Sequence, residues 1–212
     1  MNTITGLLYQ IPILLFSLTI HEFSHGITAY YLGDDTAKRA GRLTLNPISH
    51  IDPIGLLMLF IAHIGWAKPV PINPYNFKNY KRDTAITAAA GPISNFLIAI
   101  ILSIFFHILQ GIIPAEKLMA GFNQTVFFAL YYAILINLAL GLFNLIPLPP
   151  LDGSKILGGF LTDQQYARYT AKERQGAMIL MIIFAADYIL RLGLIRSIIE
   201  VPLSFFINLL LR

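Results

Sequence analysis

Cysteine is missing from the sequence, and charged residues are scarce. Without cysteine the chain has no disulfide bond, no thiolate-ligated zinc site and no cysteine nucleophile. Charged residues make up 12% of the 212 residues, whereas ordinary globular domains carry about a quarter. Hydrophobic residues reach 56%, and the mean hydropathy is +0.67. This composition predicts a membrane protein, and residues 1–212 are expected to form a single membrane-embedded domain.

Acidic residues are fewer than basic ones, with 11 Asp and Glu against 15 Lys and Arg. A basic balance can indicate a nucleic-acid partner, but here the basic residues lie in short loops between apolar runs. That distribution is typical of the positive-inside topology of membrane proteins, so we expect contact with the lipid bilayer and no nucleic acid. The N-terminus also lacks a cationic region and a small-residue cleavage site. The segment from Ile4 to Ile20 is therefore predicted to be a retained span and not a signal peptide.

Long apolar runs are the most prominent feature of the chain. About 20 apolar residues cross the hydrocarbon core of a bilayer. The run from Ile54 to Trp66 has only about 13 residues and is flanked by basic loops, so we expect it to enter the membrane and return on the same side, with a tilted span as the alternative. The apolar runs cover residues 4–31, 54–66, 84–113, 125–146, 176–190 and 195–211. The predicted fold is an all-α, multi-pass membrane protein with about five to six hydrophobic helices, one of them re-entrant.

Prolines and an alternating segment interrupt this helical pattern. Pro92 lacks a backbone donor and predicts a kink in the span from Thr84 to Ile113. Three prolines between residues 147 and 150 exclude a helix there, and a new helix is predicted from Gly153 to Leu161. Polar and apolar side chains alternate in Arg42-Leu43-Thr44-Leu45, which predicts a small membrane-associated β element.

The sequence His21-Glu22-Phe23-Ser24-His25 lies inside the first apolar run. Two histidines four positions apart on a helix lie roughly 40° apart around its axis, so both can bind one metal ion. Glu22 flanks the same face, where it can hold a water molecule on the metal. Ionisable side chains at bilayer depth are costly. This cost favours a functional site over the alternative, which is a structural polar patch or ion pair inside a helix bundle.

The order of the spans brings a third candidate ligand to the same side. If the first helix ends on the basic, cytoplasmic side and residues 54–66 return there, the next two spans cross and come back. Asp152 then emerges in the same leaflet as His21 and His25. Catalytic zinc has three protein ligands and an open position for water, so we predict one Zn²⁺ bound by these three side chains. Iron or cobalt would suit the same ligands, and Asp152 could instead cap a helix.

The remaining polar candidates have predicted roles beside this metal. Zinc lowers the pKa of bound water to about 7, and Glu22 can take the proton and pass it to a departing amine. Asn95 and Asn144 could hold a substrate backbone or an oxyanion, or they could satisfy carbonyl groups freed by a proline and by a helix end. His50 is interpreted as structural or as a support for a ligand, not as a ligand itself. Two lone histidines are interpreted as ordinary interior residues: His63 and His107.

Three motifs together resemble the site-2 protease family of intramembrane zinc metalloproteases. In that family's order they are His21-Glu22-Phe23-Ser24-His25-Gly26, Ala90-Gly91-Pro92-Ile93-Ser94-Asn95 and Asn144-Leu145-Ile146-Pro147-Leu148-Pro149-Pro150-Leu151-Asp152-Gly153. The loop from Gly41 to Pro53 resembles a compact prokaryotic branch of the family. The resemblance covers about residues 4–161, whereas the hydrophobic helices expected in residues 175–212 match nothing specific. No PDZ or CBS module is visible in the sequence.

The resemblance implies a metal held by His21, His25 and Asp152, with Glu22 as the catalytic acid–base residue. It also implies that the two asparagines, at positions 95 and 144, position the substrate or stabilise its transition state. The substrates would be transmembrane segments of other proteins, cleaved by regulated intramembrane proteolysis. The expected location is the cell membrane, with the active site toward the cytoplasmic leaflet.

Cleavage of such a substrate poses a physical problem, because a membrane-spanning helix hides its peptide bonds in its own hydrogen bonds. An exposed strand can pair with a loosened segment, and residues 42–46 are the predicted strand. The main alternative function is a membrane metal-ion transporter that uses the buried His and Glu side chains as a transit site. One compact cluster with few other buried acids is less typical of a transport path. An inactive scaffold for membrane partners is a third hypothesis, but no motif residue is degraded.

Overall fold

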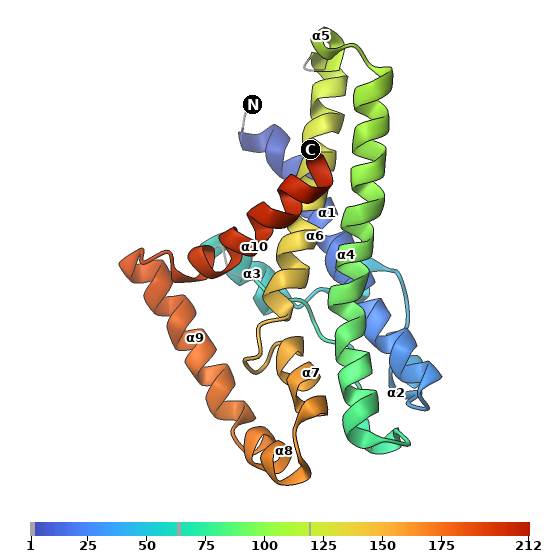
Figure 1. Cartoon of the computed structure of the whole chain (residues 1–212), viewed down its shortest axis with the longest axis vertical. Helices are drawn as coiled ribbons and strands as arrows, with labels where there is room; N and C mark the ends of the chain where they lie inside the picture. Colours follow the sequence, from blue (N-terminus) through green and yellow to red (C-terminus); the bar gives the residue numbers. More distant parts are fainter. Residues whose placement is uncertain (1–2, 63–64, 119) are drawn as a thin grey trace.

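The computed structural model describes residues 3–62, 65–118 and 120–212, and all the regular secondary structure among them is helical (Figure 1). The long helices are α1 (Thr3–Tyr31), α4 (Tyr80–Ile112), α6 (Gly121–Asn144), α9 (Glu173–Leu190) and α10 (Leu194–Leu211). The short ones are α2 (Thr36–Arg39), η1 (Pro47–His50), α3 (Pro53–Ala62), η2 (Pro74–Asn76), α5 (Ala115–Leu118), α7 (Asp152–Phe160) and α8 (Asp163–Thr170), with η marking 3-10 turns. The prediction of an all-helical fold is confirmed.

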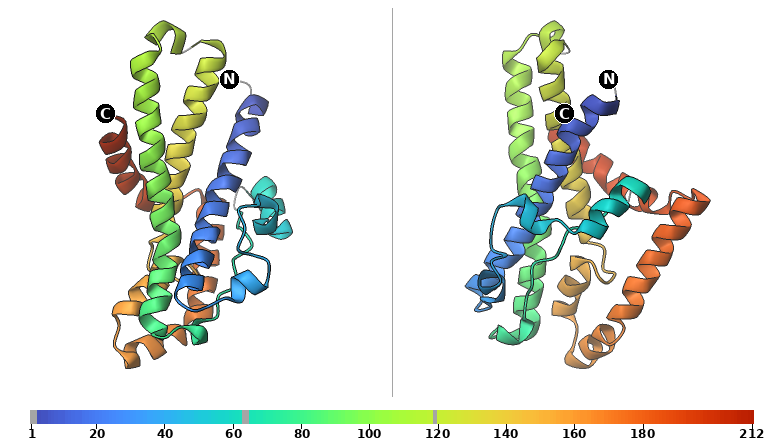
Figure 2. Two further views of the ribbon diagram at one scale, coloured as in Figure 1. Left: turned by 90° about the vertical axis from the view of Figure 1, so that its right-hand side faces the viewer. Right: turned by 180° about the vertical axis from the view of Figure 1, so that it is seen from behind.

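Helices α1, α4 and α6 form a bundle. Helices α4 and α6 run antiparallel and are joined through α5 at the top of Figure 1. Helix α1 packs against both of them, as the two further views in Figure 2 show. Near α5 the contact between α4 and α6 is apolar, and the ring of Phe106 stacks on that of Phe127 with centroids 4.4 Å apart.

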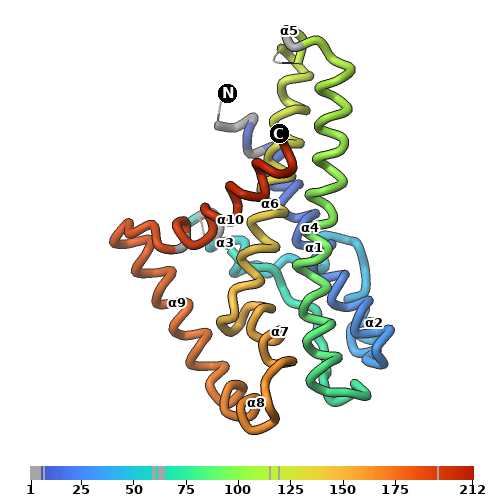
Figure 3. The backbone as a smooth tube through the Cα atoms, in the orientation of Figure 1, coloured from blue at the N-terminus to red at the C-terminus, as the bar shows by residue number. Residues whose placement is uncertain are grey.

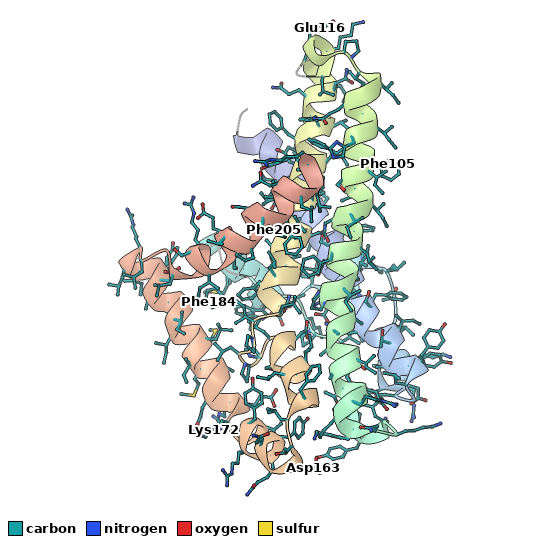
Figure 4. The ribbon with its side chains drawn as sticks, viewed as in Figure 1. Phe105, Glu116, Asp163, Lys172, Phe184 and Phe205 are labelled. Atoms are coloured by element: carbon teal, nitrogen blue, oxygen red, sulfur yellow. The ribbon has the colours of Figure 1, made fainter. Side chains whose placement is uncertain are left out.

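Among the described residues, α4 and α6 are long and apolar enough to cross a membrane. They coincide with the spans predicted at residues 84–113 and 125–146. Large apolar side chains on α4 point outward, such as Phe105, which is 54% exposed (Figure 4). Charged side chains mark both ends of the molecule, with Glu116 at one end and Asp163 and Lys172 at the other (Figure 4). A further charged group lies around the turn between α9 and α10, namely Arg191, Arg196 and Glu200. An apolar surface between two charged ends is the arrangement of a membrane protein.

Helix α4 begins four residues before its predicted start at Thr84. Asn79 caps it, because its side chain accepts a hydrogen bond from the backbone N–H of Arg82. Such a cap satisfies one of the donors left free at a helix N-terminus. The helix then continues through Pro92 as one element, so the proline does not end the span.

The predicted β element is not confirmed. Residues 42–46 lie in a loop, and the described part of the chain contains an isolated bridge between Ile51 and Ala67 but no strand. Residues 68–73 run nearby, and Arg42 Nη2 donates to the carbonyl of Lys68 at 2.8 Å. This neighbour contains two prolines, at positions 69 and 71. Because proline has no N–H to donate, a regular ladder cannot form along it.

The run predicted to be re-entrant forms α3, while His63 and Ile64 lie outside the described residues. Asp52 caps α3, since its Oδ1 accepts two backbone N–H groups of the first turn. Gly55 lies so close to the backbone carbonyl of Trp66 that a Cβ atom there would clash. The 10 residues of α3 make a helix about 15 Å long, half the thickness of the hydrocarbon core. The helix is therefore too short to span the bilayer alone, and its re-entrant course stays a prediction.

The two C-terminal runs, predicted at residues 176–190 and 195–211, form α9 and α10. Helix α9 diverges from the bundle apart from a contact between Phe184 and Phe143 of α6, and α10 returns to pack against α6 and α4 (Figures 1 and 3). Between them the chain turns at Arg191 and Gly193, which have positive φ angles of 53° and 68°. Helix α7 begins one residue before its predicted start at Gly153.

Candidate metal centre

Three buried side chains from distant parts of the chain converge between α1 and α7. His21 and His25 lie one turn apart on α1, and Asp152 is the first residue of α7. Nε2 of His21 lies 3.0 Å from Nε2 of His25 and 3.1 Å from Oδ2 of Asp152. The third side of this triangle, from Nε2 of His25 to the same carboxylate oxygen, measures 3.2 Å. The structure thus brings together the three residues predicted as metal ligands.

Helix α4 closes one side of this triangle, and it can approach because residue 91 is glycine. A Cβ atom on Gly91 would lie 2.6 Å from Nε2 of His21 and closer still to Nε2 of His25. Any side chain at this position would therefore displace the imidazoles. The sequence predicted a kink from the neighbouring proline but not this contact. The sequence does contain a lone glycine in an apolar span. That glycine indicates a close contact only once α4 is known to face the histidines.

Each imidazole is held through its other ring nitrogen. Nδ1 of His25 lies 2.7 Å from the backbone carbonyl oxygen of Thr87, an atom that only accepts hydrogen bonds. Nδ1 of His21 lies 2.6 Å from Oδ1 of Asn95. In both rings Nδ1 is therefore the donor, provided that the oxygen and not the nitrogen of Asn95 faces His21. A neutral ring that donates from Nδ1 has an unprotonated Nε2.

The orientation of Asn95 follows from a buried series of hydrogen bonds. On α6, Nδ2 of Asn137 donates to the carbonyl of Ala133 at 2.8 Å and to Oγ of Ser17 at 2.9 Å. Its Oδ1 is therefore the atom that accepts the hydrogen bond from Nδ2 of Asn95, at 2.9 Å. With Nδ2 so engaged, Oδ1 of Asn95 faces His21 and accepts its proton.

Asn95 and Asn137 are both enclosed, with exposed fractions of 0% and 1%. The resemblance implied that Asn95 positions the substrate, and the alternative was that it satisfies freed carbonyl groups. In the structure both the oxygen and the nitrogen of its amide have protein partners, His21 and Asn137. Its place favours another role, which is to orient His21. Asn137 was missed by sequence reasoning. The signal for it was an amide in the middle of an apolar span, where an unpaired polar group would be costly.

The donor set fits a divalent metal ion. Two unprotonated nitrogens and a carboxylate oxygen lie 3.0–3.2 Å apart, close to the spacing of about 3.3 Å expected between ligands of a tetrahedral ion with bonds of about 2.0 Å. Lone pairs at this separation repel one another without a cation between them. Two imidazoles and one carboxylate are also a known ligand set of catalytic zinc. The alternative role of Asp152 as a helix cap is not observed, because Leu151 holds the N-cap position of α7.

A cavity of about 220 Å³ lies beside the triangle. Its lining includes the predicted catalytic residue Glu22 and one of the two predicted substrate-binding residues, Asn144. Oε2 of Glu22 accepts a hydrogen bond from the backbone N–H of Val70 at 2.8 Å, so Glu22 stands outside the triangle. Asn144 donates Nδ2 to the carbonyl of Leu140 at 3.1 Å, which leaves the rest of its amide for another partner.

Val70 belongs to residues 68–73, which we call the strap because the segment lines the cavity across from the metal centre. Both ends of the strap are hydrogen-bonded to other parts of the chain. The backbone N–H of Lys68 donates to the carbonyl of His50 at 2.9 Å, and that of Asn73 donates to Oδ2 of Asp34 at 2.7 Å. Glu22 is thus held by a segment that is itself anchored on either side of the contact.

Asp34 accepts the hydrogen bond at the Asn73 end of the strap and is fully buried, two residues before α2. Burial alone would raise the pKa of its carboxyl group. Hydrogen bonds from Thr36, Asn73 and Asn76 outweigh burial and hold that pKa below its ordinary value. The group that anchors the strap is therefore ionised at neutral pH.

The remaining histidines lie away from the triangle. His50 is 3% exposed, and its Nε2 donates to the carbonyl of Thr44 at 2.9 Å. His107 donates from Nε2 to the carbonyl of Leu210 at 2.8 Å, which ties α4 to α10. His63 lies outside the described residues.

Comparison with known proteins shows which protein family the chain is similar to. The model of Peptidase family M50 matches residues 9–186. The chain is similar to "Putative zinc metalloprotease YwhC" of Bacillus subtilis (strain 168), with 41% identity over 179 residues that cover 83% of this chain and 80% of that protein. It is also similar to the protein of the same description named Rip2 from Mycobacterium tuberculosis (strain ATCC 25618 / H37Rv), with 31% identity over 178 residues. That match covers 81% of this chain and 64% of Rip2. No solved structure is significantly similar to the chain.

Proposed function

Because this chain belongs to peptidase family M50, the site-2 protease family, and is therefore a zinc metalloprotease, we propose that it cleaves peptide bonds within or next to transmembrane segments of other proteins. One observation carries this proposal. The triangle of His21, His25 and Asp152 is buried in a bundle that includes two helices long and apolar enough to cross a membrane. A hydrolytic centre in such a bundle is reached most directly by a substrate that is itself in the membrane.

Glu22 is the proposed general base and acid beside the metal ligands. When bound by the triangle, zinc supplies Lewis-acid chemistry, because it polarises a carbonyl group and lowers the pKa of water. The Val70 N–H engages one carboxylate oxygen of Glu22, and the other oxygen is free to take a proton from the attacking water. The water oxygen bonds to the carbonyl carbon of the substrate. As the C–N bond breaks, Glu22 returns the proton to the departing nitrogen.

The two predicted asparagines are proposed to have different roles. Asn144 lines the catalytic cavity with part of its amide unused, so it is the residue proposed to bind the substrate backbone or its oxyanion. Asn95 is enclosed between His21 and Asn137, so we propose that it positions the imidazole and not the substrate.

We also propose that the metal centre lies toward the cytoplasmic leaflet of the cell membrane. Near α2, the strap and the start of α4 the loops contain an excess of basic residues, whereas the α5 turn contains Glu116 and Lys117 and is balanced. The positive-inside rule places the basic loops in the cytoplasm. In this arrangement the whole chain is one multi-pass domain with about five to six hydrophobic helices, of which α3 is re-entrant.

The test is cleavage of a single-span model substrate by the purified, zinc-loaded chain in detergent. Glu22→Gln should lower kcat at least about 100-fold, because general base catalysis contributes that much or more. Its zinc content should stay at that of the wild type, since Glu22 is not a proposed ligand. Glu116→Gln is the matched control at the opposite end of the molecule and should keep full activity.

Zinc removal by a chelator should abolish cleavage, and zinc addition should restore it. Full activity of Glu22→Gln, or cleavage that continues without zinc, would contradict the proposal. Zinc transport into sealed vesicles without any cleavage would support the transporter alternative instead.

A further inference from the structure

A second cavity, of about 90 Å³, lies between α1, α6 and the loop that leads from α3 into the strap. Its walls are mainly apolar. The lining includes Leu18 of α1, Leu140 of α6, Trp66 and Ala67 before the strap, and His50 of η1. None of the metal ligands lines it, and the mechanism above makes no use of it.

This cavity is displaced from the catalytic cavity by about one turn along the same elements. On α1, Leu18 lines the second cavity, and Glu22, four residues later, lines the catalytic one. On α6 the corresponding pair is Leu140 and Asn144. One helical turn is about 5.4 Å, and side chains on the same face of an extended peptide are about 6.6 Å apart. An extended peptide with one bond at the metal centre therefore reaches the second cavity with a side chain close to that bond.

Three polar residues line this mainly apolar cavity, namely Thr19, His50 and Asp52, and His50 is the one with a buried ring nitrogen that lacks a partner. Its Nε2 donates to the carbonyl of Thr44, so its Nδ1 is an acceptor. In the described structure this Nδ1 is buried and has no hydrogen-bond partner. A buried acceptor without a partner is costly, so an occupant that brings a donor is favoured over one that does not.

A third cavity, of about 180 Å³, adjoins the catalytic cavity away from the second one. The catalytic and third cavities share Pro74, Thr84 and Lys155, whereas neither shares a residue with the second. Glu173 and Tyr166 also line the third cavity, which is more polar than the second. The environment thus changes from apolar, through the metal centre, to polar. A peptide that leaves the lipid for water changes in the same order.

We propose that the second cavity is a specificity subsite that binds one small, branched side chain of the substrate near the scissile bond. This inference rests on the proposed function. An apolar cavity of about 150 Å³ holds benzene, so a cavity of about 90 Å³ is too small for an aromatic ring and suits a valine or threonine side chain. Threonine has the shape of valine and adds a hydroxyl donor for Nδ1 of His50. We therefore expect threonine to be preferred.

The test measures kcat/KM of the zinc-loaded full chain in detergent for variants of one single-span substrate. Once the cleaved bond has been mapped by mass spectrometry, the residues on either side of it are changed in turn to Ala, Thr, Val and Phe. At one of these positions Thr should exceed Val by about fivefold and Phe by at least about 50-fold. The other positions should not show this order.

Leu18→Ala should enlarge the cavity and change the preference at that one position. The ratio of kcat/KM for Phe over Val should rise at least about tenfold, since one methylene group in a hydrophobic pocket is worth about 10- to 200-fold. Leu8→Ala is the matched control, because Leu8 is on the same helix and is 72% exposed. It should leave the order of substrates unchanged.

The outcomes separate this inference from the proposed function. If cleavage occurs but no position responds to Leu18→Ala, the second cavity is not a substrate subsite. If that position responds but accepts Thr and Val equally, the hydrogen bond to His50 is wrong. If no substrate is cleaved in a zinc-dependent way, the proposed function itself fails.

Discussion

The two halves of the helix bundle are built in different ways. In the half next to α5, the core between α4 and α6 consists mainly of apolar side chains such as Ala99, Phe106 and Phe127, and the hydroxyl of the buried Ser103 is satisfied within its own helix. In the half next to α7, the same helices enclose Asn95 and Asn137, which join Ser17 of α1 to the metal centre. Apolar cores tolerate exchanges that conserve volume, whereas every buried polar atom depends on a particular partner. Equal changes in the two halves should therefore have unequal effects.

The largest contrast is expected between two glycines on α4. Gly91→Ala places a methyl group against both imidazoles, so zinc binding and cleavage should both fall at least about 100-fold. Gly111→Ala is the same substitution near the other end of α4, where a Cβ atom meets nothing within 4 Å. It should keep zinc and activity, because alanine is the better helix former. Metal content and kcat/KM of both variants measure this difference, and a fully active Gly91→Ala variant would contradict the close approach of α4 to the histidines.

A smaller contrast is expected within α6. Asn137→Leu keeps the approximate volume but removes the partner of Asn95, which in turn orients His21. Loss of a group that orients a metal ligand typically weakens metal binding by about 10- to 100-fold. Ile134→Val, one turn away in the apolar core, should lower the free energy of unfolding by about 1 kcal/mol and leave zinc affinity unchanged.

Zinc affinity by competition with a chelator, together with thermal unfolding in detergent, separates the two cases. For Asn137→Leu both the zinc affinity and the thermal stability should fall, because Nδ2 of the buried Asn95 loses its partner, whereas Ile134→Val should lower the thermal stability alone. Unchanged zinc affinity would show that the hydrogen bonds from Asn137 through Asn95 do not orient His21.

The same comparison explains which site residues could be predicted from the sequence. His21, His25 and Asp152 were accessible because their chemistry restricts them to few roles in a membrane, and because counting the spans places all three on one side. Gly91 and Asn137 were not accessible, since their roles depend on which faces of α4 and α6 turn toward α1. An apolar run predicts that a helix exists but not its rotation about its own axis.

Two other expectations show the same limit. Asn95 was singled out, but its partner could not be foreseen, because Asn137 comes from another helix. The alternation of residues 42–45 predicted a strand, yet a strand also needs a neighbour with free backbone groups. Pro69 and Pro71 remove two of the donors such a neighbour would supply.

The last contrast lies outside the bundle, at the end of the strap, and concerns stability but not zinc binding. Asp34→Asn removes the charge that accepts hydrogen bonds from Thr36, Asn73 and Asn76. A hydrogen bond to a charged group contributes about 1.5–3 kcal/mol, so the free energy of unfolding at neutral pH should fall by about 2 kcal/mol. Zinc should stay bound, because Asp34 does not belong to the triangle. Asp35→Asn, at the neighbouring and partly exposed carboxylate, is the matched control and should have less effect.

The pH dependence of this effect has a definite sign. The pKa of Asp34 is lowered in the folded protein, so the ionised carboxylate is the form that stabilises the fold. This stabilisation is fully present above about pH 4, the ordinary pKa of aspartate, and is lost as the pH falls through the lower folded value. The difference in thermal unfolding between wild type and Asp34→Asn should therefore be large at about pH 7 and shrink toward about pH 3. A difference that is the same at both ends of this range would mean that the ionised form of Asp34 does not hold the strap.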